Sequence, residues 1–236
     1  LKRGTCYYHT GDFENAEKDI SSASESVKGN NEPLVILAAI YIKKKELDSA
    51  LKVLHKAESI SANDPAVLFQ AGSIYYYRND EKYADYFDRL HNIVKEHDTD
   101  YKNYIKAFKL LMTYHYNKKN YSRSLEISNS LQSGGNDYDV IITAARSYHY
   151  LGQHEEAILA FKKISLRNGS DKVLFAGSYA ASGRKDPAVE ILKNIQFDQN
   201  AYSEAKKNKY LQPLIKEIEK EAELRRKEQL NKTVTP

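Results

Sequence analysis

The stretch that decides the fold is residues 38–57, AAIYIKKKELDSALKVLHKA. A small residue, Ala38, precedes the aromatic Tyr41 by three positions, and a second small residue, Ala50, follows that tyrosine by nine. Leu54 lies four residues further on, at the interval that keeps side chains on one face of a helix. The stretch therefore predicts two helices joined by a short turn, with small residues where the two backbones come closest.

This pattern recurs along the chain at intervals near 34 residues. Six aromatic residues are each followed, nine positions later, by a small one. The pairs are Tyr7 and Ala16, Tyr41 and Ala50, Tyr75 and Ala84, His115 and Ser124, Tyr148 and Ala157, and Tyr179 and Ala188. A period in this range is typical of repeat proteins, in which each helix pair packs on its neighbours. One interval, from Tyr75 to His115, is 40 residues long. We expect its additional residues to lengthen the first helix of the fourth pair at the N-terminal end.

These residues resemble tetratricopeptide repeats. The resemblance is clearest in residues 38–57 and in residues 145–161, ARSYHYLGQHEEAILAF, and it covers about residues 1–197. It implies an all-α fold, a right-handed α-solenoid of about six antiparallel helix pairs. The first pair is expected to be incomplete because Leu1 corresponds to the fifth position of a repeat, so we expect a fragment of a longer chain. Residues 198–236 are expected to form a C-terminal capping helix and a charged tail.

Composition excludes several classes of function. Thirty-six Lys and Arg face thirty-two Asp and Glu, a net charge of +4 that gives little reason to expect nucleic acid as a partner. No stretch approaches the roughly 18 apolar residues of a membrane-spanning helix. One cysteine, Cys6, excludes an internal disulfide and an all-cysteine metal site. The seven histidines include no pair at metal-binding helical spacing, so we expect no catalytic residue, no metal, no cofactor and no enzyme activity.

The family resemblance also indicates where a partner would bind. In tetratricopeptide repeats the first helices of the pairs line a concave groove that binds other proteins. The predicted partner-binding residues at these positions are Val35, Ile36, Phe69, Tyr76, Tyr77, Lys109, Tyr116, Ile142, Arg146, His149 and Tyr150. Apolar patches mark interaction surfaces, and Tyr and Arg are frequent anchors of interfaces. We expect a scaffold within a multiprotein assembly that binds a peptide or an amphipathic helix of a partner protein. In this hypothesis the aromatic residues are the anchors, and Lys109 and Arg146 orient an acidic group.

Several alternatives stay open at this stage. The chain could be a regulatory or substrate-docking arm of a larger enzyme, or its groove could take a small hydrophobic ligand. The C-terminal helix of the chain itself could occupy the groove. A clamp for the carboxylate of chaperone tails is disfavoured, because only Lys109 matches the family's clamp positions and Thr113 stands where an Asn is needed.

Overall fold

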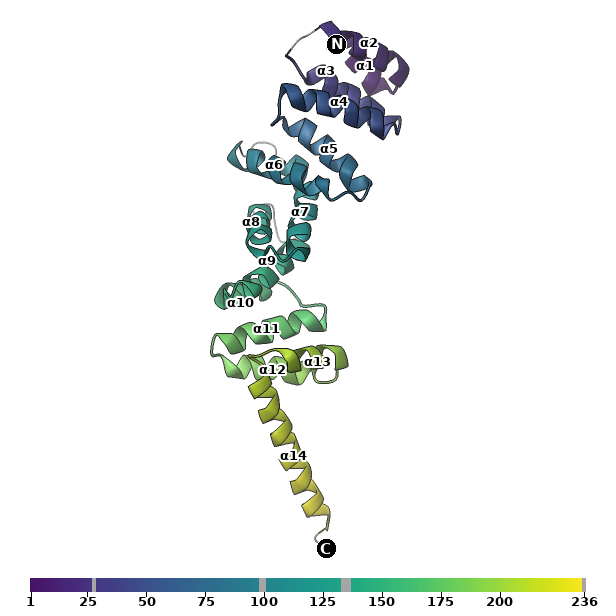
Figure 1. Ribbon diagram of the computed structural model, residues 1–236. Coiled ribbons are helices and arrows are strands. Elements are labelled where there is room, and N and C mark those ends of the chain that lie inside the picture. Colours follow the sequence, from purple (N-terminus) through teal and green to yellow (C-terminus); the bar gives the residue numbers. More distant parts are fainter. Residues whose placement is uncertain (27–28, 98–100, 133–136, 235–236) are drawn as a thin grey trace. The chain divides into compact units, whose positions relative to one another are not determined.

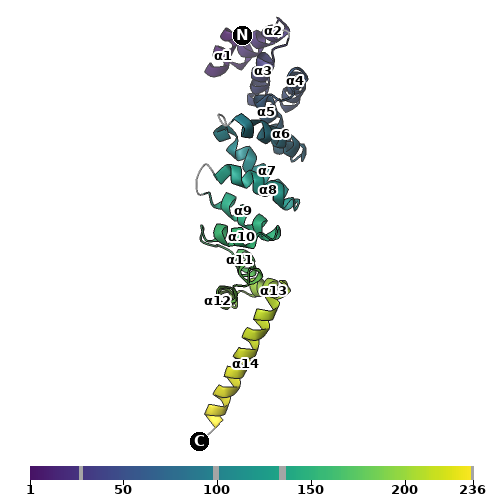
Figure 2. The same ribbon diagram turned by 90° about the vertical axis from the view of Figure 1, so that its left-hand side faces the viewer.

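The computed structural model describes residues 1–26, 29–97, 101–132 and 137–234, with only the backbone described for 95–97 and 230–234. Within these residues the chain forms α-helices and one short 3₁₀-helix, and no strand (Figures 1 and 2). The helices are α1 (Lys2–Thr10), α2 (Phe13–Ser26), α3 (Glu32–Lys43), α4 (Leu47–Ile60), α5 (Pro65–Tyr77), α6 (Lys82–His97), η1 (Tyr101–Tyr104), α7 (Ile105–Asn117), α8 (Tyr121–Gln132), α9 (Tyr138–Tyr150), α10 (His154–Phe161), α11 (Gly169–Ala181), α12 (Lys185–Ile195), α13 (Gln199–Lys207) and α14 (Gln212–Val234).

The chain divides into two compact units, which we call unit 1 (Leu1–Tyr114) and unit 2 (His115–Pro236). In unit 1 each helix from α1 to α6 packs against the next one along the chain. In unit 2 the helices from α8 to α12 are stacked in the same consecutive way. The all-α helical repeat fold expected from the sequence is confirmed.

The small residues of the pattern lie where the two helices of a pair meet. All six residues at the second position of the pairs are buried: Ala16, Ala50, Ala84, Ser124, Ala157 and Ala188. The small residue three positions before the aromatic residue is equally confined. A Cβ added to Gly72 would lie 2.5 Å from Cε1 of Phe87, on the facing helix α6. Close helix packing therefore explains the first half of the repeat pattern.

The aromatic position has a second, backbone role at the turn of each pair. Its carbonyl accepts a hydrogen bond from the backbone N–H five residues later, as in the bonds from Glu46 to Tyr41 and from Gln153 to Tyr148. The residue just before that donor has a left-handed backbone in every pair. These residues are Gly11 (φ 81°), Lys45 (φ 64°), Asn79 (φ 55°), Lys119 (φ 61°), Gly152 (φ 76°) and Gly183 (φ 77°). This is the C-terminal capping geometry that ends a helix and reverses the chain.

The long interval between the third and fourth pairs differs from the expectation. The additional residues do not lengthen α7 as an α-helix: α7 begins at Ile105 and is preceded by the 3₁₀-helix η1. The rings of Tyr101 and Tyr104 pack on Phe108, with centroids 4.9 and 6.2 Å away. Residues 98–100 lie outside the described part of the chain. Four residues of the long interval thus form a short 3₁₀-helix at the N-terminal end of α7, and two of its tyrosines pack on the core.

Two helices, α13 and α14, follow the sixth pair and pack on it. Helix α13 lies so close to α11 that a Cβ added to Gly169 would be 2.5 Å from Cβ of Ala201. Leu211, Leu214 and Ile215, at the start of α14, are buried in one core with α11 and α12. The later part of α14 extends past α12 and α13 in both views and is exposed (Figures 1 and 2). Unit 2 is thus closed by a further helix pair whose second helix is unusually long.

Candidate partner-binding surfaces

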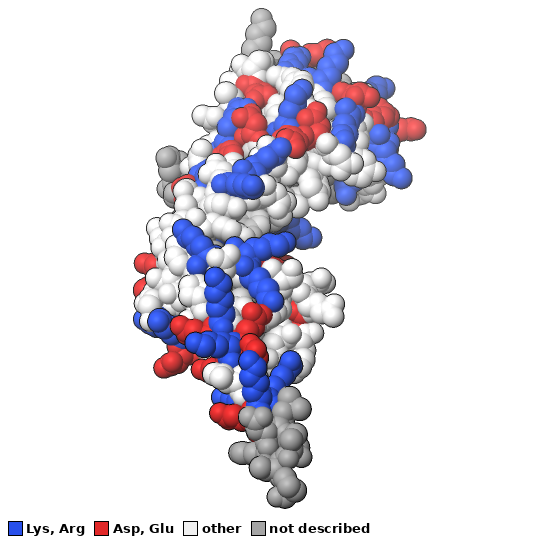
Figure 3. Space-filling model, turned by 60° about the horizontal axis from the view of Figure 1, so that its bottom comes forward, with Lys and Arg blue, Asp and Glu red and all other residues white. Residues whose placement is uncertain are grey.

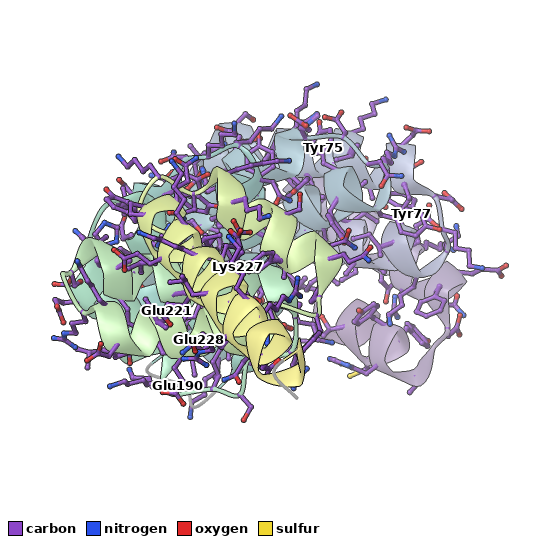
Figure 4. The ribbon with its side chains drawn as sticks, turned by 90° about the horizontal axis from the view of Figure 1, so that it is seen from below. Tyr75, Tyr77, Glu190, Glu221, Lys227 and Glu228 are labelled. Carbon is purple, nitrogen blue, oxygen red and sulfur yellow. The ribbon has the colours of Figure 1, made fainter. Side chains whose placement is uncertain are left out.

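Unit 1 contains an open hollow between the ends of α3 and α5 and the beginning of α4. Its volume is ≈ 440 Å³, and we call it the unit 1 hollow. It is lined by Ile42, Lys45, Leu47, Ser73, Ile74 and Tyr77. Tyr77 is 78% exposed, whereas Ile74 is buried. Tyr75 and Tyr77 leave α5 on different sides, so only Tyr77 contributes its ring to this hollow (Figure 4).

The basic residues around the unit 1 hollow differ in whether they already have a partner. The Lys44 ammonium binds carboxylates of both Glu17 and Glu46, at 2.7 and 3.0 Å, and these bonds raise the pKa of Lys44. Arg78 binds Asp48 at 2.8 Å. Lys43 and Lys45 are exposed and form no ion pair with any residue that the structure describes. Lys45 lines the hollow, and Lys43 follows the lining residue Ile42 on α3, so the hollow carries one positive charge without an ion partner among the described residues and a second lies next to it in the chain.

The other predicted residues of unit 1 lie outside this hollow. Val35 and Ile36 are half-buried, and the Val35 carbonyl accepts a hydrogen bond from the Gln70 side chain at 3.4 Å. Phe69 packs between Phe87 and Tyr104, with ring centroids 6.5 and 5.2 Å away. Tyr76 and Lys109 complete the set: Tyr76 is 44% exposed with its ring against Tyr83, and Lys109 is half-buried. Of the six predicted residues in unit 1, Tyr77 alone lines the hollow.

Unit 2 brings three tyrosines together at the junctions of its helices. Tyr121 stacks on Tyr150 with ring centroids 4.6 Å apart, and Tyr116 lies 6.4 Å from Tyr150. Burial raises the pKa of Tyr116 above its usual value. Tyr150 keeps 47% of its surface exposed, so this cluster presents one accessible ring.

Arg146 is held by the protein itself. Its guanidinium donates two hydrogen bonds to the carboxylate of Asp171, at 2.6 and 2.8 Å, and this bond raises the pKa of Arg146. Asp171 is buried and also accepts from the Asn168 side chain at 2.6 Å. The pair joins α9 to α11, and such a bidentate pair is strong. Arg146 thus already has a carboxylate partner within unit 2.

The remaining predicted residues, Ile142 and His149, are buried. Ile142 is part of the core with Ala157 and Phe161. Nδ1 of His149 lies 2.8 Å from the Ser178 hydroxyl. Since that hydroxyl donates its single proton to the Leu174 carbonyl, the imidazole N–H is the donor. Burial, and to a smaller extent His154, lowers the pKa of His149 to about 4.

A short segment of the C-terminal region packs on Gly177 and His154, next to His149. We call residues 208–210, between α13 and α14, the strap. A Cβ added to Gly177 would lie 2.9 Å from the Asn208 amide nitrogen and 3.2 Å from the His149 ring. Both side chains therefore lie close to the backbone of Gly177. Tyr210 packs edge-on against His154, with ring centroids 5.5 Å apart. The Asn208 side chain accepts the Tyr210 backbone N–H at 3.0 Å, which fixes the shape of the strap.

Comparisons with known proteins identify one repeat by sequence. Residues 138–168 match the profile of the tetratricopeptide repeat. This stretch of the chain is a tetratricopeptide repeat. No match is found among curated proteins by sequence. The fold is similar to that of solved tetratricopeptide repeat structures, one from Parabacteroides merdae ATCC 43184 (17% identity, TM-score 0.51, 92% of this chain and 94% of that chain) and YrrB (19%, 0.57, 80% and 97%). It is also similar to a part of the Naa15/Naa10 complex bound to HypK-THB (13%, 0.61, 92% and 34%).

Three further features of this chain bear on its chemistry. Among the described residues, no group of three or more His, Cys, Asp and Glu side chains is placed to hold a metal ion. None of the described helices is long and apolar enough to cross a membrane. On the face shown in Figure 3, basic and acidic side chains are interleaved.

Sequence reasoning missed part of both surfaces. Lys45 and Leu47 lie in the turn and at the start of the second helix, outside the first-helix positions that the family resemblance names. The strap lies beyond the last repeat, where the pattern gives no register. One signal was present: Gly177, Ala180 and Ala181 are unusually small for groove positions, which is what a covering segment requires.

Proposed function

We propose that this chain is a non-catalytic scaffold that binds a peptide or helix of a partner protein, within a multiprotein assembly. The observation that carries the proposal is the open hollow of unit 1 with its exposed Tyr77. A concave, mostly apolar site with a few polar groups at its edge is the usual form of a ligand site, and its volume falls within the usual range of about 300–1,000 Å³. An exposed tyrosine at such a site is a typical interface anchor.

Two of the similar structures agree with this proposal. YrrB is described as a tetratricopeptide repeat protein with an unusual peptide-binding site, and the Naa15/Naa10 structure contains a bound third protein. The interleaved charges of Figure 3 and the net charge of +4 favour a protein partner over nucleic acid, because phosphate backbones are bound by continuous basic surfaces.

The test is site-specific photo-crosslinking in a lysate of the source organism. The photoreactive residue p-benzoylphenylalanine replaces Tyr77 in one preparation. In the matched control it replaces Lys52, an exposed residue on α4 that does not line the hollow. We expect a discrete crosslinked protein from position 77 that is absent from position 52 and is reduced by Ser73→Leu, which narrows the hollow. The same products from both positions, or none from position 77, would contradict the proposal.

A further inference from the structure

The unit 1 hollow has a counterpart in unit 2 at the same positions of the repeat. Taking the aromatic residue of each repeat as reference, Tyr41 corresponds to Tyr148, and Tyr75 corresponds to Tyr179. The hollow residues Ile42, Lys45, Leu47, Ser73, Ile74 and Tyr77 then correspond to His149, Gly152, His154, Gly177, Ser178 and Ala181. The strap contacts His154 and Gly177, and the ring of His149 lies beside Gly177. One site is open in unit 1, and its equivalent in unit 2 is filled by the chain's own segment.

The filled site shows what kind of segment fits. In unit 2 the occupant is non-helical, and it places one aromatic side chain, Tyr210, against the position equivalent to Leu47. It lies over small residues, because Ala181 stands where unit 1 has the larger Tyr77. In unit 1 the larger Tyr77 side chain lines one side of the hollow, and the interior is lined by Ile42, Leu47 and Ile74. An apolar side chain from an extended segment is thus the occupant that this geometry favours.

The charges at the two sites are different. The strap carries a basic residue, Lys209, whose ammonium lies 4.8 Å from the centre of the Tyr210 ring. Unit 2 has Gly152 at the position of Lys45, which lines the unit 1 hollow, and Tyr150 at the position of Lys43, which follows the lining residue Ile42. Since these two lysines form no ion pair among the described residues, they would repel a basic segment such as the strap and attract carboxylates.

We propose that the unit 1 hollow binds an extended segment of a partner protein that inserts one aromatic or aliphatic side chain and carries Asp or Glu within two positions of it. This inference rests on the proposed function and specifies its partner. Successive residues of an extended chain are about 3.3 Å apart, so a carboxylate one or two positions from the inserted side chain would be close enough to pair with Lys45, which lines the hollow. Ser73 adds an acceptor for a segment N–H, because its hydroxyl proton is donated to the Phe69 carbonyl.

The probe is a phage library of random dodecapeptides selected on the full chain. We expect enriched peptides to share an aromatic or aliphatic residue with an acidic residue within two positions. A fluorescein-labelled copy of an enriched peptide should lose at least tenfold in affinity with Tyr77→Ala, with Ser73→Leu, and with Lys43→Glu combined with Lys45→Glu. Since Tyr77 is largely exposed, Tyr77→Ala leaves the fold intact even if another variant does not.

Matched controls separate the inference from the proposed function. Lys52→Glu with Lys56→Glu changes the charge equally on exposed residues of α4, and Tyr150→Ala removes an exposed tyrosine of unit 2. Both should change the affinity less than twofold. Peptides that need the hollow but show no acidic preference would overturn the inference and leave the proposed function standing. Peptides that instead need Tyr150 would do the same.

Two other outcomes would overturn more than the acidic preference of the partner segment. Absence of enrichment, or peptides insensitive to every variant, would overturn both the inference and the proposed function. A concentration-dependent dimer in sedimentation analysis that Ser73→Leu abolishes would make a second copy of the chain the occupant and would overturn the partner-peptide assignment.

Discussion

The same position of the repeat is open in unit 1 and covered in unit 2. In unit 1 the site between α3 and α5 is open, with Tyr77 as its wall and Lys45 at its edge. In unit 2 the equivalent site is covered by residues 208–210. The residues at equivalent positions differ in size: unit 2 has Gly177 and Ala181 where unit 1 has Ser73 and Tyr77. A repeat architecture therefore does not imply equivalent binding sites, because a segment of the chain itself packs at the position in unit 2 that is open in unit 1.

The largest expected effect is a pH dependence confined to the covered site. His149 has a usual pKa near 6.5 that burial lowers to about 4, so folding favours the neutral ring. The stability that the chain gains from keeping His149 neutral is complete above pH 6.5 and is lost as the pH falls from 6.5 towards 4. At about 1.4 kcal/mol per tenfold change in proton affinity, this is about 3 kcal/mol. His154, whose pKa is also lowered by burial and by Lys209, acts in the same direction.

Urea unfolding at pH 7 and pH 4.5 measures this effect in the unsubstituted chain and in His149→Gln. The ionisable groups other than the one at position 149 are the same in both proteins, so their contributions cancel in the comparison. We expect the loss of unfolding free energy on acidification to be about 2–3 kcal/mol smaller in the variant. Equal losses would show that the burial of His149 is not maintained in solution.

A substitution pair at equivalent positions gives the next largest effect. Gly177→Leu places a side chain where Asn208 and His149 already lie, and such overpacking costs about 2 kcal/mol. Ser73→Leu adds the same side chain to the open hollow, where it has space and gains helix propensity, so we expect a change within about 0.5 kcal/mol. Urea unfolding followed by circular dichroism compares the two. Equal destabilisation would mean that both sites are filled, or that both are empty.

The third effect compares Tyr210, in the strap, with Tyr77, in the unit 1 hollow. Tyr210→Ala removes the ring that rests on His154, and we expect a loss of about 1 kcal/mol. Tyr77→Ala removes a ring that is mostly in solvent, so unfolding should change by less than about 0.5 kcal/mol. Hydrogen exchange of residues 205–212 should accelerate in the first variant only. Faster exchange there in both variants would contradict the independence of the two sites.

The smallest effect tests the turns. Lys45 and Gly152 occupy equivalent left-handed positions, at φ 64° and 76°. Because glycine adopts this conformation without a steric cost, Lys45→Gly should stabilise unit 1 and Gly152→Lys should destabilise unit 2, each by about 0.5–1 kcal/mol. Thermal unfolding measures both changes. A stabilising Gly152→Lys would show that a side chain finds compensating contacts at this turn.

The sequence predicts the helix pairs well because their signal is local. The interval of nine residues from Tyr41 to Ala50 has two local causes. Ala50 is buried where the two helices come closest, and the turn between them is closed by a hydrogen bond from the Glu46 N–H to the Tyr41 carbonyl. The candidate site is predicted less completely. Family groove positions include Tyr77 but not Lys45 or Leu47.

Two contacts between distant residues were beyond the reach of the pattern. Arg146 was expected to face a partner, and the structure instead joins it to Asp171, 25 residues later. The strap places Tyr210 on the ring of His154, more than 50 residues earlier in the sequence, and it follows no repeat. Contacts of this kind depend on which elements stack in three dimensions, and a period in the sequence does not record them.

The central claim, that equivalent sites are open in unit 1 and covered in unit 2, is tested most directly by the reaction of cysteines with a bulky maleimide. In a Cys6→Ser background, Ile42→Cys and His149→Cys place one thiol at the same repeat position in each unit. We predict that the thiol at position 42 reacts at least tenfold faster than the thiol at position 149, and that adding Asn208→Gly and Tyr210→Ala removes most of this difference. Equal rates before those additions, or a slow reaction at position 149 that persists after them, would contradict the claim.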